Sequence, residues 1–251
     1  MKALGVALVA VLTCGLLWAP SGLQLPLPGR GAVPMVGFSF SDRAARAEGE
    51  DPAVALRTLL RRLQPDLVRL PVYWDEVEPE RGVFDFSVVH SLLAEVANSA
   101  RTRVVLVVGI RNLGYPEVYA PAWAGYSGSV PELMRSPAYL DYLGTVFAHY
   151  RGSRLLYAWQ VENEPLDETN SSLGLVAEPY DALSDVISDL RAADPAHPVV
   201  VTSYDSASVA LDKQASSRWS WVWSRLPVPQ PAGHPLPALT LGDALGLDVY
   251  V

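Results

Sequence analysis

The chain has 251 residues, half of them hydrophobic, and carries a formal net charge of -8 at pH 7. This length and this apolar fraction allow one large hydrophobic core, so the sequence predicts a globular domain of enzyme size. The acidic balance argues against a nucleic-acid-binding protein, because such proteins use clustered lysine and arginine to replace phosphate counterions.

The first 21 residues have the pattern of a secretory signal peptide. Met1 and Lys2 precede an apolar run over residues 3–18, and Ala19-Pro20-Ser21 offers a small-residue cleavage site. The run is shorter than the roughly 20 residues that a membrane-spanning helix needs, so a cleaved signal is favoured over an N-terminal membrane anchor. We therefore expect a secreted or extracytoplasmic protein without stable membrane insertion. Residues 22–34 form a Pro/Gly-rich connector.

From residue 35 to residue 251 the pattern alternates between strands and helices. Strands are predicted at 35–40, 67–73, 103–109, 198–203 and 245–251, and a further strand begins at 157 and ends at Asn163-Glu164-Pro165. Helices are predicted at 51–63, 87–100, 137–150 and 180–193, the first of them with Asp51 as N-cap and Pro52 in its first turn. Such alternation with short turns is typical of one α/β domain with a parallel sheet.

Glu164 is the strongest candidate for chemistry. It follows a buried strand directly, where partial desolvation favours the protonated carboxyl group, and a carboxylic acid can deliver a proton to a leaving group. Hydrolysis of a glycosidic bond needs such a donor together with a second carboxylate across the bond. Asn163 adds a neutral hydrogen-bonding group suited to a sugar hydroxyl, and Pro165 ends the strand because it cannot donate to a sheet.

Asn163 and Glu164 resemble the asparagine and the acid/base glutamate at the end of the fourth strand in the clan A glycoside hydrolases. Arg69, in the second predicted strand, matches an arginine that supports the catalytic carboxylates in that clan. The segment 74–86, with Trp74, Glu-Pro, Gly and Asp-Phe in order, is similar to the loop that commonly follows that strand. The resemblance implies a TIM (β/α)8-type barrel, which typically needs about 250 residues.

The same resemblance implies the activity and the remaining site residues. A complete barrel of this kind would hydrolyse O-glycosidic bonds in an oligo- or polysaccharide by a retaining mechanism, with Glu164 as acid/base and Asn163 and Arg69 in substrate binding. Trp74 and Tyr250 are further substrate contacts that it implies. Its partner would be a carbohydrate.

The sequence departs from the clan pattern at the second carboxylate. The nucleophile of the clan is a glutamate after the seventh strand, whereas about six βα units are predicted here and no glutamate follows Glu178. We therefore expect the chain to be the front three-quarters of a longer enzyme and to be inactive alone. The alternative is a non-catalytic carbohydrate-binding or surface protein derived from the same barrel. Glu162 is predicted to be a buried structural carboxylate paired with an arginine such as Arg69; a catalytic role for Glu162 or Asp248 is the weaker alternative.

No cofactor or metal is expected from the sequence. The four histidines make no metal-ligand spacing with one another or with Cys14, the only cysteine. No phosphate-binding glycine loop is present. Two features stay open between sugar contact and packing: the loop after the third strand, which begins at Arg111 and includes Trp123, and the tryptophans at 219, 221 and 223.

Overall fold

The computed structural model describes residues 34–114, 118–166, 178–204 and 235–248. The predicted signal peptide, nearly all of the connector and Tyr250 lie outside these ranges. No helix within the described ranges is both long enough and apolar enough to cross a membrane.

Six parallel strands form one sheet, and their order in the sheet, β1-β2-β3-β4-β5-β6, is their order in the sequence. A doubly wound sheet reverses its strand order at a switch point, whereas a barrel adds each strand beside the preceding one. The described strands are therefore six of the eight that close a (β/α)8 barrel, which confirms the predicted incomplete TIM-type barrel. All six carboxyl ends lie at the same edge of the sheet, where barrel enzymes form their active sites.

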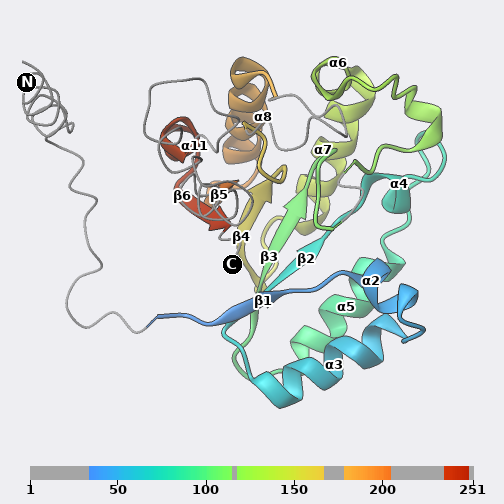
Figure 1. The fold of residues 1–251 in the computed structure, drawn as a ribbon, viewed down its shortest axis with the longest axis vertical. Helices are drawn as coiled ribbons and strands as arrows, with labels where there is room; N and C mark the ends of the chain where they lie inside the picture. Colours follow the sequence, from blue (N-terminus) through green and yellow to red (C-terminus); the bar gives the residue numbers. More distant parts are fainter. Residues whose placement is uncertain (1–33, 115–117, 167–177, 205–234, 249–251) are drawn as a thin grey trace, which may run out of the picture. The chain divides into compact units, whose positions relative to one another are not determined.

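The strands and helices alternate along the chain (Figure 1). The strands are β1 (Gly37–Ser39), β2 (Leu67–Pro71), β3 (Arg103–Val108), β4 (Leu156–Val161), β5 (Val199–Tyr204) and β6 (Ala244–Asp248). The helices are α2 (Asp42–Ala47), α3 (Pro52–Leu63), α4 (Trp74–Val77), α5 (Ser87–Ala97), α6 (Val130–Met134), α7 (Pro137–Tyr150), α8 (Tyr180–Ala193) and α11 (Pro235–Leu241), with a 3-10 turn η1 (Ala122–Ala124). Neighbouring helices pack in pairs, α3 beside α5 and α7 beside α8.

Local sequence explains the helix ends. The Asp51 side chain accepts the backbone N–H of Val54 (2.9 Å), and Pro52 lies at the first helical position of α3. The same arrangement begins α7, where Ser136 accepts the N–H of Tyr139 (3.2 Å) and Pro137 follows. The buried face of α7 is rich in aromatic side chains that belong to the hydrophobic core, and Phe147 packs edge-on against Trp159 of β4.

The described residues include four short helices in regions where the sequence predicted neither a helix nor a strand. α2, α4, α6 and α11 contain four to seven residues each, too few for a clear helical period in the sequence. The sixth strand begins at Ala244, and its predicted last three residues lie outside the described ranges.

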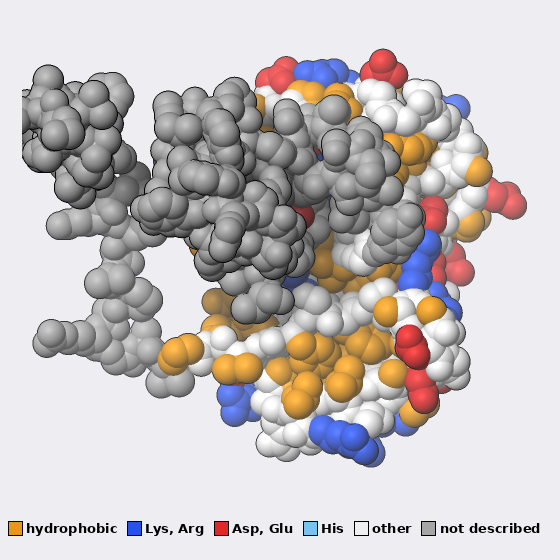
Figure 2. Space-filling model, in the orientation of Figure 1, with side chains coloured by type: hydrophobic (Ala, Val, Ile, Leu, Met, Phe, Trp, Pro, Cys, Tyr) orange, Lys and Arg blue, Asp and Glu red, His pale blue; other side chains and the backbone are white. Residues whose placement is uncertain are grey.

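Figure 2 shows hydrophobic side chains over the part of the described surface where Figure 1 has β1 and α3. Met35 and Val36, just before β1, and Val54 and Leu63 in α3 are exposed. β1 and β6 are the two outer strands of the described sheet, and closure of a barrel would pair both.

Two exposed histidines join α5 and α7. His90 Nε2 and His149 Nε2 lie 2.8 Å apart, and the His149 ring stacks on Phe86 at 3.9 Å between centroids. Partial burial and the neighbouring His90 both lower the pKa of His149. One ring can donate and the other accept only while at least one of them is neutral.

Because of the His90–His149 pair, we expect the stability of the fold to decrease modestly in acid. A pKa that is lower in the folded state than in the unfolded chain gives stability above the unfolded value, about 6.5 for histidine, and loses it as the pH falls further. We expect the urea midpoint of the wild type to fall more between pH 8 and pH 5 than that of His149→Gln, which keeps a hydrogen-bonding group but cannot be protonated. Parallel midpoint curves would show that the pair does not contribute.

Candidate active site

The candidate site lies where β2 and β4 end, and one arginine joins the two strands there. Arg69 is the third residue of β2, and its Nη2 donates to Asn163 Oδ1 (3.3 Å) while Nη1 donates to Ser39 Oγ (3.2 Å). Residues 94 positions apart in the sequence are thereby brought together at the carboxyl edge of the sheet. Arg69, Asn163 and Glu164 therefore lie in one region of the fold.

The turn after β4 has an unusual backbone. Glu162 and Glu164 have φ angles of 58° and 48°, in the left-handed region that residues other than glycine rarely adopt. Such conformations cost free energy and persist only where surrounding contacts impose them, which happens often at functional sites. Glu164 itself is buried, with 2% of its surface exposed.

Hydrogen bonds to both neighbouring strands impose this conformation. The Glu162 N–H donates to Val108 O at the end of β3 (2.8 Å), and the Asn163 N–H donates to Arg111 O (3.1 Å). On the other side, the Glu164 N–H donates to Thr202 Oγ1 in β5 (2.9 Å). The three consecutive residues are thus tied to β3 and β5 by their own backbone.

Gln160 orients the Asn163 side chain from within β4. Its Nε2 donates to Glu162 O (3.0 Å) and lies 3.3 Å from Asn163 Oδ1 and 3.4 Å from Thr202 Oγ1. Asn163 Oδ1 thus accepts from both Gln160 and Arg69, so its amide nitrogen is directed away from these donors. Sequence reasoning missed Gln160 and Thr202, although both belong to strands that it predicted.

Glu162 is fully buried and accepts three hydrogen bonds. The N–H groups of Ile110 (2.9 Å) and Arg111 (2.5 Å) donate to its two carboxyl oxygens, and the Tyr139 hydroxyl donates to Oε1. Burial raises the pKa of Glu162 to about 7, although these donors and the Arg111 charge act in the opposite direction. Glu162 has the expected surroundings of a structural carboxylate, but the arginine that acts on it is Arg111 rather than Arg69.

Gly109 leaves the space that the Glu162 carboxyl group occupies. A Cβ added at Gly109 would lie 2.4 Å from Glu162 Cδ, and the φ angle of Gly109 is 134°. Neither the space nor the backbone accommodates a side chain. The glycine after β3 and the glutamate after β4 therefore depend on each other.

We expect Gly109→Ala to destabilise the fold by more than about 3 kcal/mol, since it combines an unfavourable φ with displacement of a hydrogen-bonded carboxylate. Chemical denaturation monitored by tryptophan fluorescence measures this loss. Gly144→Ala is the matched control, because a Cβ at Gly144 in α7 meets nothing within 4 Å. A Gly109→Ala protein as stable as this control would contradict the packing described.

Trp74, one of the predicted substrate contacts, lies in the hydrophobic core. Its side chain has no exposed surface, its Nε1 donates to Glu78 Oε2 (2.8 Å), and its ring stacks on Tyr142 at 5.2 Å. Trp123 packs edge-on against it and donates to Glu78 O (2.9 Å). A sugar contact at Trp74 therefore requires this packing to open. Tyr250 and the side chain of Asp248 lie outside the described part of the chain.

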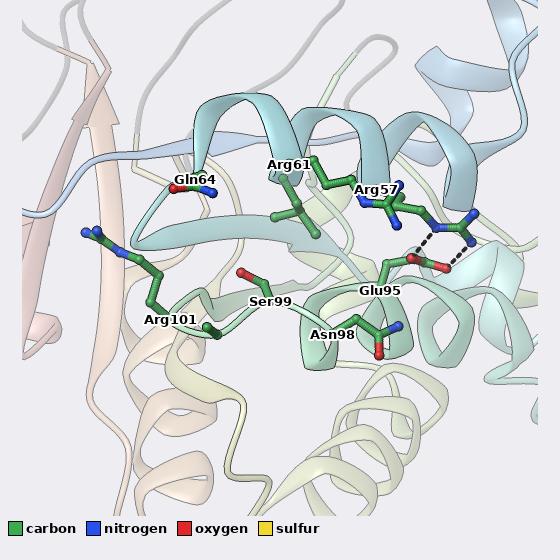
Figure 3. Close-up of a pocket in the computed structure, with 9 residues that line it drawn as sticks. Arg57, Arg61, Gln64, Glu95, Asn98, Ser99 and Arg101 are labelled. Carbon is green, nitrogen blue, oxygen red and sulfur yellow. Dashed lines mark hydrogen bonds and ion pairs between the residues drawn. The ribbon is translucent and has the colours of Figure 1, made fainter.

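A cavity of about 290 Å³ lies at the opposite end of the strands (Figure 3). It is lined by side chains from the middle and end of α3, from the last turn of α5 and from the segments that lead into β2 and β3. Arg57 and Glu95 form a bidentate pair there at 2.7 and 2.6 Å, and Arg101 pairs with Asp66. Its position at the amino ends of the strands separates it from Glu164, so it has no part in the candidate site.

No family model matches the chain. Endo-1,4-beta-xylanase C of Phanerodontia chrysosporium is 28% identical over 137 residues, which are 53% of this chain and 32% of that protein. An endo-1,4-beta-xylanase of Agaricus bisporus is 33% identical over 125 residues, 50% of this chain and 35% of that protein. The chain thus spans about a third of the length of these curated relatives.

Solved structures share the fold at low sequence identity. The exo-beta-1,4-mannosidase Op5Man5 from Opitutaceae bacterium strain TAV5 has a TM-score of 0.54 at 17% identity and covers 87% of this chain and 39% of its own. A GH5_18 structure from Streptomyces cattleya in complex with GlcNAc has a TM-score of 0.50 at 17% identity, covering 70% and 46%. The sequence relatives and the shared fold together confirm that this chain resembles the (β/α)8-barrel glycoside hydrolases, as the Asn163-Glu164 motif and the segment after β2 predicted.

Proposed function

We propose that the chain forms the acid/base part of a glycoside hydrolase barrel that cleaves O-glycosidic bonds in a polysaccharide with retention of configuration. The observation that carries this proposal is the Asn163-Glu164 pair at the carboxyl end of β4, tied by hydrogen bonds to β2, β3 and β5. Relatives named endo-1,4-beta-xylanase support a β-1,4-linked xylan as the first substrate to test.

Each residue of the pair has a defined task in this reaction. Glu164 donates its proton to the glycosidic oxygen while the bond from that oxygen to the anomeric carbon breaks. A second carboxylate forms a bond to the same carbon, and Glu164 then removes a proton from the water whose oxygen displaces that carboxylate. The amide nitrogen of Asn163 donates to a sugar hydroxyl, because its Oδ1 is taken by Arg69 and Gln160.

The second carboxylate must lie about 5 to 5.5 Å from the first in a retaining enzyme. Within the described ranges, Glu162 lies close to Glu164 in the sequence, but its carboxyl group is already bound to two backbone N–H groups and a tyrosine. We therefore propose that the nucleophile comes from a strand beyond the six described here.

The N-terminal part completes the proposal. Residues 1–21 act as a signal peptide, 22–34 as a connector and 35–251 as the barrel domain, so that the protein works outside the cytoplasm. The division of the chain into units 1–34 and 35–251 supports the last boundary. A mass spectrum of the mature N-terminus after secretion tests the cleavage.

The activity is tested with the whole protein that contains this chain. We expect reducing sugar to be released from β-1,4-xylan, and proton NMR of the first product to show the anomer of the substrate. Inverted product would exclude the retaining mechanism. Retention of the protein on a xylan affinity gel without any hydrolysis of xylan or mannan would instead identify a carbohydrate-binding protein.

A further inference from the structure

Glu178, two residues before α8, is buried without a hydrogen-bond donor. Only 3% of its surface is exposed, and among the described residues neither of its carboxyl oxygens has a hydrogen-bond partner when the carboxyl group is ionised. An ionised carboxylate that is buried without hydrogen-bond donors costs too much free energy to persist. The carboxyl group is therefore expected to be protonated, and its O–H then needs a hydrogen-bond acceptor nearby.

That acceptor is the carboxyl group of Glu162, which is within hydrogen-bonding reach of Glu178. Two ionised carboxylates can only accept, so no hydrogen bond exists between them until one carries a proton. A single proton between Glu162 and Glu178 therefore provides a partner for a Glu178 oxygen. It also removes the repulsion of two buried negative charges.

We propose that Glu178 is a neutral carboxylic acid that donates a hydrogen bond to the Glu162 carboxylate, and that this pair is a positioning device for the acid/base Glu164. The second half of the proposal rests on the function proposed above; the protonation of Glu178 does not.

The surroundings assign the proton to Glu178 rather than Glu162. Glu162 accepts from Ile110, Arg111 and Tyr139, all of which favour its charged form, whereas Glu178 accepts from none of these groups. Burial and the Glu162 charge raise the pKa of Glu178 well above its ordinary value, against the opposing charge of Arg111. Tyr139 and Tyr142 of α7, whose pKa values burial raises, stay neutral and add no charge.

The pair can position Glu164 through Pro165, the residue that follows it. The Glu178 N–H donates to Pro165 O at 2.7 Å, and Arg111 Nη1 lies 3.4 Å from the same oxygen. Glu162 holds the other end of the turn, two residues before Glu164. Loss of the shared proton would repel Glu178 from Glu162 and so pull on both ends of this turn.

Infrared spectroscopy tests the protonation directly. We expect the difference between the spectra of wild type and Glu178→Gln at pH 8, where Glu162 is largely ionised, to contain the carbonyl band of one protonated carboxylic acid that the variant has lost. Glu50→Gln, which changes an exposed glutamate, is the matched control and should keep the band. An unchanged band in Glu178→Gln, or no such band in the wild type, would overturn the proposal.

Stability against pH gives a second, independent measurement. A proton kept by folded Glu178 but released by the unfolded chain makes stability decrease as pH rises above about 4.3, the ordinary glutamate pKa. Glu178→Gln has no such proton to release. The ratio of its folding equilibrium constant to that of the wild type should therefore rise about tenfold for each unit of increasing pH. Curves that stay parallel between pH 5 and pH 7 would contradict a protonated Glu178.

Turnover by the whole protein separates positioning from mere stability. Glutamine can still donate to Glu162, so Glu178→Gln should keep kcat within about threefold, whereas Glu178→Leu should lower kcat more than tenfold with KM nearly unchanged, measured well below its melting temperature. Equal kcat in Glu178→Gln and Glu178→Leu would be compatible with a protonated Glu178 but would exclude a role of the pair in positioning Glu164. If the wild type turns over no glycoside, the proposed function fails. The infrared result still tests, independently of activity, whether Glu178 is protonated.

Discussion

Replacing Glu164 by glutamine is expected to lower turnover of natural polysaccharide by about 10²- to 10⁴-fold in the whole protein, the usual contribution of general acid catalysis. Glutamine keeps the size of the side chain, and the backbone N–H of residue 164 can still donate to Thr202 Oγ1. The fold should therefore remain, and the loss should come from the missing proton.

The dependence on the leaving group makes this prediction specific. Aryl glycosides with acidic phenols need little protonation, so their first step should be much less affected than hydrolysis of xylan. Steady-state kinetics on both substrate types measures the difference, and a melting curve of Glu164→Gln controls for folding. Small and equal losses on both substrates would remove Glu164 from the acid/base role.

Glu162→Ala is expected to have the largest effect on stability, a loss of about 3 to 5 kcal/mol. The change leaves the N–H groups of Ile110 and Arg111 and the hydroxyl of Tyr139 without their acceptor in a fully buried place. It also removes the negative charge of Glu162, which acts on the buried Arg111. Urea denaturation at pH 8 measures this loss, since Glu162 is largely ionised above its pKa of about 7.

A surface carboxylate supplies the comparison. Asp181 accepts from Arg135 at 3.0 Å, but 77% of its side chain is exposed. Water and salt screen this pair, so Asp181→Ala should change the urea midpoint far less than Glu162→Ala. Equal shifts in the two variants would show that Glu162 is not the buried centre of hydrogen bonds described here.

The local sequence determined the order and type of the main elements. Asp51 and Pro52 mark the start of α3, and the run of β-branched residues in β3 marks a strand buried on both faces; these signals depend on neighbours along the chain. The strand order then follows, because short βα connections put each strand beside the one before it. The Asn163-Glu164 pair was likewise recognisable, since it directly follows a predicted strand.

Only the tertiary structure decided which groups surround the glutamates. The arginine that acts on Glu162 is Arg111, which follows β3. The carboxyl group that lies beside Glu162 belongs to Glu178, which precedes α8. Trp74 lies in the core instead of at the surface because Trp123 and Tyr142, distant in sequence, close over it. The sequence shows which residues a strand carries to its end. Burial and hydrogen bonding depend on contacts between strands and helices, and these exist only after the sheet has curled and the helices have packed.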